Sequence, residues 1–376
     1  MTIDNNIPQG YKQTELGIIP EDWNIKSIGE FLSIGNGHDY KGKSFGNIPV
    51  YGTGGIITHI DDYLYDGQTI CIGRKGTIDK PIFHSGKIWT VDTLYYTYNF
   101  IDIEVKFIYY LLLTIDWMSL NEATGVPSLT SDRIKQIALA LPPIAEQRAI
   151  AEALSDVDGL IAALDKKIAK NRLLKQGAMQ QLLTGKKRLP GFTDEWVEKK
   201  VKDVFRVTRG YVLATNKVVE RPDGYYKYPV FSSQTQNNGV MGYYSDYLFE
   251  DAITWTTDGA NAGEVNYRQG KFYCTNVCGV LISEEGYANE CVASIINMVA
   301  KSHVSYIGNP KLMNNVMADI EICIPPSIKE QQAIATILSN MDKEIADLEA
   351  QRDKYRLLKS GMMQKLLTGQ IRLKTE

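Results

Sequence analysis

Three short segments in the first part of the sequence combine glycines with side chains that donate and accept hydrogen bonds. They are residues 37–43, 51–55 and 73–77. From them we select His38, Tyr40, Lys41, Lys43, Tyr51, Thr53, Arg74, Lys75 and Thr77 as candidate contact residues. Arginine and lysine suit guanine edges and phosphate groups, so these segments could contact DNA if they lie on exposed loops. The alternative is that they are ordinary solvated turns.

Three segments in the second half lie at corresponding places but carry different side chains. The candidates there are Arg209, Tyr211, Ser232, Ser233, Gln234, Gln236, Asn237, Asn238, Thr257, Asp258 and Asn261. Glutamine and asparagine favour adenine edges rather than guanine edges. The two sets therefore predict two surfaces of one kind with different base preferences.

Motifs for catalysis are missing from the sequence. Asn309-Pro310-Lys311 lacks the second proline and the aromatic residue of an amino-methylation motif, and no Walker-type phosphate loop is present. Gly52-Thr53-Gly54-Gly55 resembles part of a dinucleotide loop but lacks the flanking βαβ pattern. Cys274 and Cys278 could suggest zinc, yet their counterparts in the first half are Thr90 and Leu94, so ordinary packing is favoured. We expect no catalytic residues, no metal and no cofactor.

The elements that must position the candidate loops occur in two copies in the sequence. Glu146 to Ala151 recurs as Glu330 to Ala335, and the segment Leu-Leu-Thr-Gly at 182–185 recurs at 366–369 with the same offset. Both copies follow a Pro-Pro pair, and the segments between them correspond more faintly. The order is therefore variable segment, constant segment, variable segment, constant segment, which is typical of a duplicated fold.

Each constant segment is expected to form a long helix. In the first copy the apolar positions are spaced alternately by four and three residues, which is the seam of a coiled coil. They are Ile150, Leu154, Val157, Ile161, Leu164 and Ile168. The second copy keeps this pattern from Ile334 to Leu348, and Arg352 then interrupts it. Each helix should contain roughly 38 residues and span about 55 Å. A pseudo-twofold repeat predicts that the two helices pair antiparallel within the chain; a coiled coil between chains is the alternative.

The variable segments are expected to be small α/β domains. In the first, strands are predicted at 47–51, 69–72, 81–84 and 88–98, with a helix at 105–119. In the second, strands are predicted at 228–231, 252–256, 264–267 and 272–282, with a helix at 289–302. The fold class is therefore α+β: two small α/β domains separated by two long antiparallel coiled-coil helices.

Composition limits the possible functions. With 44% hydrophobic residues the chain can bury cores, and its five scattered cysteines suit a reducing cytoplasm. No apolar run approaches a membrane span, and residues 1–9 lack a secretory signal pattern. The net charge of −3 opposes tight, independent DNA binding, because phosphate contacts normally supply much of the affinity.

These residues together resemble the specificity subunits of type I restriction–modification enzymes. The resemblance lies in the segment from Thr14 to Trp23, in the Pro-Pro and Glu-Gln helix starts, and in the Leu-Leu-Thr-Gly endings. It implies two target-recognition domains that each read one half of a split site in double-stranded DNA. It also implies two methyltransferase subunits, which use S-adenosylmethionine, and restriction subunits, which use ATP. Those activities belong to the partners, and the helices are expected to dock the methyltransferases and fix the spacer.

The resemblance predicts five segments along the chain. Residues 1–22 form an N-terminal segment near the C-terminal helix, and the other four are recognition domains at 23–143 and 191–326 and helical regions at 144–190 and 327–376. Two alternatives stay open: a stand-alone DNA-binding protein, and a coiled-coil scaffold with ligand-binding β domains.

Overall fold

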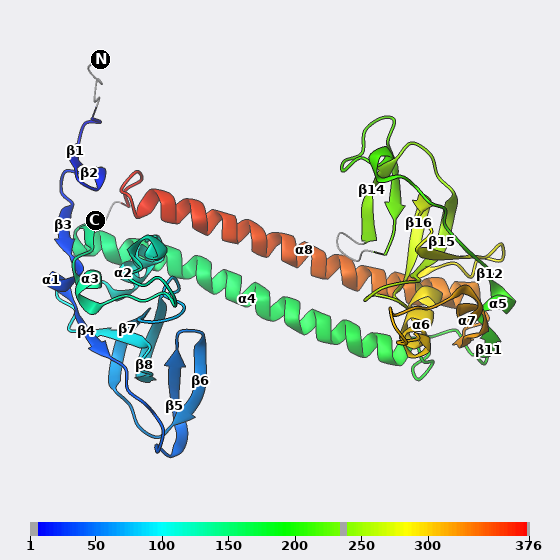
Figure 1. Cartoon of the computed structure of the whole chain (residues 1–376), viewed down its shortest axis with the longest axis horizontal. Helices are drawn as coiled ribbons and strands as arrows, with labels where there is room; N and C mark the ends of the chain where they lie inside the picture. The colour runs from blue at the N-terminus through cyan, green and yellow to red at the C-terminus, as the bar shows by residue number, and fades with distance from the viewer. Residues whose placement is uncertain (1–6, 234–238, 374–376) are drawn as a thin grey trace. The chain divides into compact units, whose positions relative to one another are not determined.

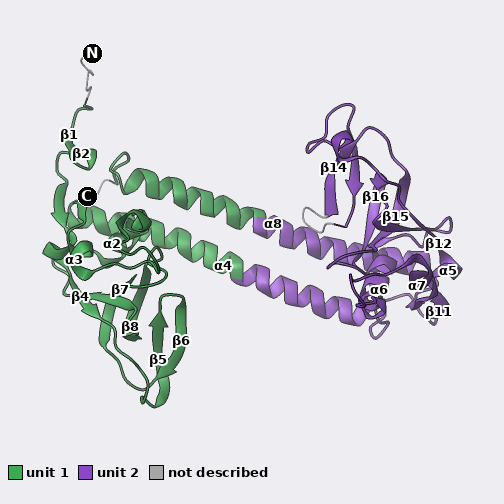
Figure 2. Ribbon diagram, viewed as in Figure 1, with its two compact units in different colours: residues 1–165, 350–376 green, residues 166–349 purple. Residues whose placement is uncertain are grey.

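A computed structural model describes residues 7–233 and 239–373 of the chain. It divides into two compact units, shown in different colours in Figure 2. Unit 1 contains residues 1–165 and 350–376, and unit 2 contains residues 166–349. The first variable domain lies wholly within unit 1 and the second within unit 2.

Unit 1 is built on a six-stranded sheet with the order β4-β9-β7-β8-β5-β6. Its strands are β4 (Ser33–Asn36), β5 (Phe45–Gly52), β6 (Gly55–Ile60), β7 (Tyr65–Gly73), β8 (Ile82–Thr90) and β9 (Leu94–Tyr98). Neighbouring strands pair antiparallel except β5 and β8, which are parallel. Helix α2 (Val105–Leu112) follows the sheet in the chain and buries Phe107 and Ile108 in the same core as Ile70 and Ile72 of β7.

Unit 2 repeats this topology with the order β12-β17-β15-β16-β13-β14. Its strands are β12 (Arg206–Arg209), β13 (Tyr228–Phe231), β14 (Val240–Tyr244), β15 (Phe249–Thr256), β16 (Val265–Cys274) and β17 (Cys278–Ile282). The single parallel pair is again at the equivalent place, between β13 and β16. Helix α6 (Glu290–Ala300) takes the place of α2 and buries Cys291, Val292 and Ile296. The two variable domains therefore have one fold, as the faint internal repeat predicted.

Shorter elements complete each unit. They are β1 (Tyr11–Thr14), β2 (Gly17–Pro20), β3 (Asn24–Ser27), α1 (Ile28–Phe31), η1 (Trp117–Leu120), α3 (Ser131–Lys135) and β10 (Ala138–Leu141) in unit 1. In unit 2 they are β11 (Val197–Lys200), α5 (Val201–Val204), η2 (Thr215–Lys217), η4 (Lys301–His303), α7 (Asn314–Asp319) and β18 (Glu321–Ile324). The pairs β3–β10 and β11–β18 join the start of each domain to the strand that leads into a long helix.

The two constant segments are helices of 39 residues, α4 (Ile144–Leu182) and α8 (Ile328–Leu366), visible as the two long helices of Figure 1. Within unit 1 their ion pairs join Asp158 to Lys359 at 2.7 Å and Asp165 to Arg352 at 3.5 Å. The position on α4 rises as the position on α8 falls, so these helix segments run antiparallel. In unit 2 the pairing of Lys175 with Asp342 continues the same pattern.

The seam predicted from the sequence faces the core at its ends. Ile150, Leu154, Val157 and Ile168 are buried in the first copy, and Ile334, Leu338 and Leu348 are buried in the second. Arg352, which interrupts the apolar pattern, is half-buried and pairs with Asp165 and Asp353 instead. An ion pair thus replaces one apolar seam contact.

The Pro-Pro and Glu-Gln pattern has a structural cause at each helix start. The amide of Gln147 donates to the Pro142 carbonyl at 2.9 Å, and its carbonyl oxygen accepts from the Glu104 amide at 3.0 Å. Glu104 is the N-cap of α2, so Gln147 joins the long helix to the first variable domain. Gln331 does the same in unit 2, since it donates to Pro325 at 2.7 Å and accepts from the α6 N-cap Asn289, also at 2.7 Å.

Five of the predicted elements were wrong in detail. The expected strand at 88–98 is two strands, because the chain turns at 91–93 between β8 and β9, and the expected strand at 272–282 turns at 275–277 in the same way. The predicted strands at 81–84 and 264–267 are the beginnings of β8 and β16 rather than separate strands. The expected helix at 105–119 ends at Leu112 and is followed by a short 3-10 turn. The sequence pattern did not predict these turns because Val91, Thr93, Thr275 and Val277 are all β-branched residues that favour strands.

Candidate nucleic-acid interface

The turn at residues 91–93 connects all three candidate loops of the first domain; we call it, together with its counterpart at 275–277, the hub turn. The His38 amide donates to the carbonyl of Thr90, just before the turn, at 2.9 Å, and the Val91 amide donates to the carbonyl of Tyr51 at 3.0 Å. The carbonyl of Thr93 accepts from the amides of Arg74 and Lys75 at 2.9 and 3.2 Å. Main-chain hydrogen bonds therefore hold the three loops around one point, whatever side chains they carry.

The second domain uses the same main-chain frame. Tyr211 donates to the carbonyl of Cys274 at 3.0 Å, Thr275 donates to Phe231 at 2.9 Å, and Thr257 donates to Val277 at 3.2 Å. Each bond is the counterpart of one in the first domain. The described parts of the three sequence segments, residues 209–211, 232–233 and 257–261, therefore lie around one hub turn as well.

Close packing at the hub turn explains a glycine in each first loop. A Cβ built on Gly37 would lie 2.0 Å from the carbonyl oxygen of Val91, and one built on Gly210 would lie 1.9 Å from that of Cys274. Such distances are far below van der Waals contact, so only glycine allows the first loop to approach the turn. The second and third loops also meet, since a Cβ on Gly76 would lie 3.5 Å from the hydroxyl oxygen of Thr53.

The candidate side chains of the first domain differ in how they are presented. His38, Lys41, Lys43, Arg74 and Lys75 are exposed, and Tyr40, Tyr51, Thr53 and Thr77 are half-buried. Lys43 is already engaged, because its ammonium pairs with Asp62 at 2.7 Å and lies 5.0 Å from the centre of the Trp89 ring. Burial raises the pKa of the Tyr51 phenol, whose hydroxyl lies 3.4 Å from Nδ1 of His84. Among the exposed loop cations, Lys41, Arg74 and Lys75 have no ion-pair partner in the part of the chain that the structure describes.

In the second domain Arg209 and Tyr211 are exposed, while Ser232, Ser233, Asp258 and Asn261 are half-buried. The Ser232 hydroxyl accepts a hydrogen bond from Thr275 in the hub turn at 2.9 Å.

Other candidates of this domain need separate comment. Thr257 is buried and its hydroxyl donates to the Asp258 carboxylate at 2.7 Å. It therefore orients that carboxylate and is not itself exposed for contact with DNA. Gln234, Gln236, Asn237 and Asn238 lie outside the described residues.

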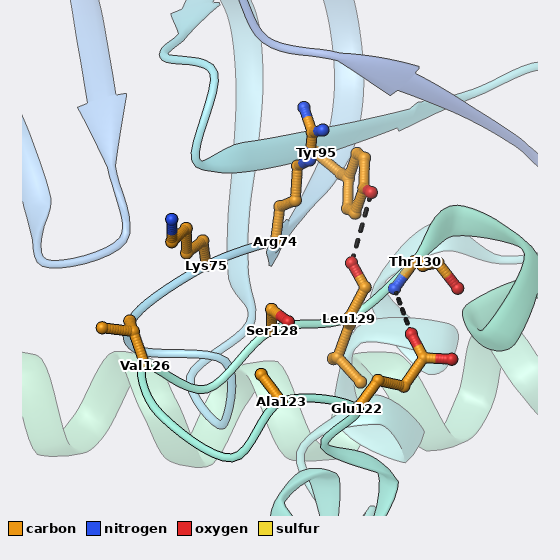
Figure 3. A pocket seen from close by; sticks show the side chains of 9 residues that line it. All are labelled: Arg74, Lys75, Tyr95, Glu122, Ala123, Val126, Ser128, Leu129 and Thr130. Carbon is orange, nitrogen blue, oxygen red and sulfur yellow. Dashed lines mark hydrogen bonds between the residues drawn. The ribbon is translucent and has the colours of Figure 1, made fainter.

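A loop that was not selected from the sequence packs against each third loop. In the first domain, Gly76 donates to Pro127 at 2.8 Å and Leu129 donates to Arg74 at 2.9 Å. The side chains of Arg74 and Lys75 border a cavity of about 520 Å³ beside this loop, with Tyr95 and Glu122 on its wall (Figure 3). The signal was present in the sequence, because Gly125 and Pro127 recur as Gly308 and Pro310.

In the second domain the cation at this contact belongs to the adjoining loop rather than to the third loop. Gly259 donates to Pro310 at 2.9 Å and Leu312 donates to Thr257 at 2.9 Å, which repeats the frame of the first domain. There, however, the third loop carries the acidic Asp258, and Lys311 on the adjoining loop pairs with it at 3.7 Å. Lys75 therefore faces Ser128 in the first domain, whereas Asp258 faces Lys311 in the second.

The described residues lack two kinds of feature. Within residues 7–233 and 239–373, no group of three or more histidine, cysteine, aspartate or glutamate side chains is arranged to hold a metal ion. The helices in the same residues include none with the length and apolar character needed to cross a membrane. The arrangement offers hydrogen-bond donors, acceptors and cations on rigidly connected loops, which is the chemistry of binding and recognition.

Comparisons with known proteins agree with this chemistry. Residues 20–171 and 193–355 match the model of the type I restriction modification DNA specificity domain. A putative type I specificity subunit of Mycoplasma pneumoniae, described as an N-terminus, is 40% identical over 142 residues, covering 37% of this chain and 74% of that protein. The putative specificity subunit of a type I restriction enzyme from Methanocaldococcus jannaschii is 24% identical over 98% of both chains.

A solved structure has the same fold. The S subunit of a type I restriction–modification system from M. genitalium aligns with 100% of this chain and 99% of its own, with a TM-score of 0.72 at 16% identity. The predictions of the fold class and of a DNA-recognition component without catalytic activity are confirmed. The chain therefore belongs to the type I restriction–modification DNA specificity family, whose domain it carries twice.

Proposed function

We propose that each recognition domain reads one half of a bipartite, asymmetric site in double-stranded DNA through the loops around its hub turn. The observation that carries this proposal is one main-chain frame that presents different side chains in the two domains. The frame fixes the distances among the loops, and the side chains supply the donors and acceptors that select bases. The candidate residues are the exposed and half-buried side chains described above.

We further propose that two methyltransferase subunits bind this chain and that restriction subunits join through the complex. The long helices α4 and α8 would dock the methyltransferases and set the number of unread base pairs between the half-sites. At 39 residues each, these helices rise about 58 Å along their axes. The net charge of −3 favours a division of labour in which the partners supply many of the phosphate contacts. The complex would act on DNA in the cytoplasm.

We propose for the protein the same segment boundaries that the sequence predicts. Residues 23–143 and 191–326 are the recognition domains, and 144–190 and 327–376 are the helical regions. Residues 1–22 are the N-terminal segment, and Tyr11 in it donates a hydrogen bond to the Gly369 carbonyl at 2.8 Å, beside the end of α8. This contact supports placing the segment near the C-terminal helix.

Methylation-site mapping tests the proposal directly. Genomic DNA is compared between cells that express the methyltransferase subunits with this chain and cells that express them without it. We expect a bipartite sequence to be methylated only when the chain is present. Methylation that is independent of the chain, or a motif without two separated halves, would contradict the proposal.

A further inference from the structure

We propose that Asp92 and Asn276, at the tips of the two hub turns, are base-reading residues that help set the specificity of their half-sites. The inference rests on the proposed function and adds two residues that the sequence patterns did not select. The two occupy equivalent positions, since each follows the residue that bonds the second loop and precedes the one that bonds the third. They are therefore the same place in one frame, filled by different side chains.

The position is central because the three loops are fixed to the residues on either side of it. In the first domain, Val91 donates to the second loop and Thr93 accepts from the third, so Asp92 lies between these two anchors. Each turn is closed by its own hydrogen bond, from Leu94 to Val91 at 2.9 Å and from Cys278 to Thr275 at 3.1 Å. A side chain at such a tip is held by the backbone with little freedom to move away.

Both side chains are exposed although their neighbours are not. Val91 and Thr275 are buried and Thr93 and Val277 are half-buried, so these flanking residues pack inward while the tip faces solvent. Across the part of the chain that the structure describes, no hydrogen bond or ion pair joins the Asp92 carboxylate or the Asn276 amide to another residue. Neither side chain thus has an evident structural task, and both are placed for an external partner.

The chemistry of the two side chains predicts different bases. An ionised carboxylate only accepts hydrogen bonds, so Asp92 suits the amino group of cytosine. A carboxylate facing DNA is repelled by phosphates, and this cost is reduced by the neighbouring Arg74, whose Nη1 lies 3.4 Å from the main-chain oxygen of Asp92. Asn276 both donates and accepts, so it suits the N6 and N7 edge of adenine.

The reciprocal exchanges Asp92→Asn and Asn276→Asp test the proposal, because each replaces one side chain with its near-isostere. The complex with the methyltransferase subunits is mixed with DNA libraries in which each position of the wild-type site is randomised in turn. We expect D92N to change the base preference at one position of one half-site by about tenfold, and N276D to do so in the other half-site. Asp66→Asn and Asn315→Asp, at exposed positions outside the loops, are the matched controls.

The outcomes separate this proposal from the proposed function. If the wild-type complex selects no bipartite site, the proposed function fails. If it selects one and both exchanged variants keep its base preference at every position, the assignment of Asp92 and Asn276 fails alone. A folded variant with uniformly weaker binding and no changed preference would give the residue a structural role and would also overturn the assignment. Melting temperatures equal to wild type would establish that each variant is folded.

Discussion

Arg188 donates two hydrogen bonds of 2.8 Å to the carboxylate of Glu330, one from Nε and one from Nη2. This pair joins the segment after α4 to the first turn of α8. Arg372 and Glu146 repeat it in unit 1, where Arg372 also binds Asp22 at 2.7 Å. The Glu330 side chain is only 1% exposed, so Arg188 balances the charge of a carboxylate that water does not reach. The hydrogen bonds to Glu330 in turn raise the pKa of the Arg188 guanidinium.

The first prediction concerns this buried carboxylate. Arg188→Met should lower the free energy of unfolding of unit 2 by on the order of 3 kcal/mol, because it leaves the Glu330 charge unpaired. Urea denaturation monitored by circular dichroism measures the loss. The double variant Arg188→Met, Glu330→Leu should recover most of it, since a buried ion pair can often be replaced by apolar side chains.

The matched control for this experiment is Lys187→Met, which removes the exposed cation beside Arg188 and should be nearly neutral. If the single Arg188 variant unfolds at the wild-type urea concentration, the pair does not stabilise the helix start.

The second prediction is a pH dependence in unit 1. Hydrogen bonds from Arg372 hold the pKa of the Asp22 carboxyl below its ordinary value of 3.8. A lowered folded-state pKa contributes stability that is present above the unfolded pKa and is lost as pH falls through the folded pKa. Asp22→Asn should therefore melt below wild type at pH 7, and the gap should close as the pH falls below 3.8. The effect should be modest, because half of the Asp22 side chain is exposed.

Glu195→Gln is the control in the other unit, where no hydrogen bond or ion pair joins the equivalent carboxylate to another described residue. Its melting temperature should follow wild type at every pH. A gap for Asp22→Asn that stays constant from pH 7 to the lowest pH at which the protein is folded would refute the electrostatic explanation.

Sequence reasoning predicted the features that depend on repetition and periodicity. The internal repeat and the seam from Ile150 to Ile168 follow from residue spacing, the antiparallel pairing follows from the pseudo-twofold repeat, and the fold class is confirmed. The hub turns were missed because their β-branched residues resemble strand, and only Asp92 and Asn276 signalled a turn. The three loops were chosen separately by composition; that they meet at one turn depends on main-chain hydrogen bonds between residues far apart in the chain.

The third prediction tests the close approach at the hub turn. Gly37→Ala should force the first loop away from Val91, because the added methyl carbon would lie 2.0 Å from a main-chain oxygen. Selection of the half-site read by the first domain should weaken by roughly tenfold or more, while the other half-site keeps its sequence. Gly224→Ala, at an exposed position outside the candidate loops where the Cβ would meet nothing within 4 Å, should bind like wild type. Equal behaviour of the two variants would show that the packing at Gly37 is not needed for reading.

The fourth prediction separates base contacts from phosphate contacts. In the complex, Arg74→Ala should relax the preference at one position of a half-site by about 1–3 kcal/mol, because arginine reads guanine edges. Lys75→Ala should weaken binding to all sequences alike and reduce the slope of log K against log salt by about one. Binding titrations at several salt concentrations distinguish the two effects. The assignment fails if Lys75→Ala alters the preferred sequence while the salt slope stays unchanged.

The most direct test of the central claim, that each domain reads its own half-site, is an exchange of one domain. Residues 196–323 are replaced by the equivalent segment of a relative with a different target, and methylated sites are mapped in cells that express the same methyltransferase subunits. We predict that one half of the recognised sequence changes, while the other half and the spacer stay as in wild type. A change in both halves, or in neither, would contradict the claim.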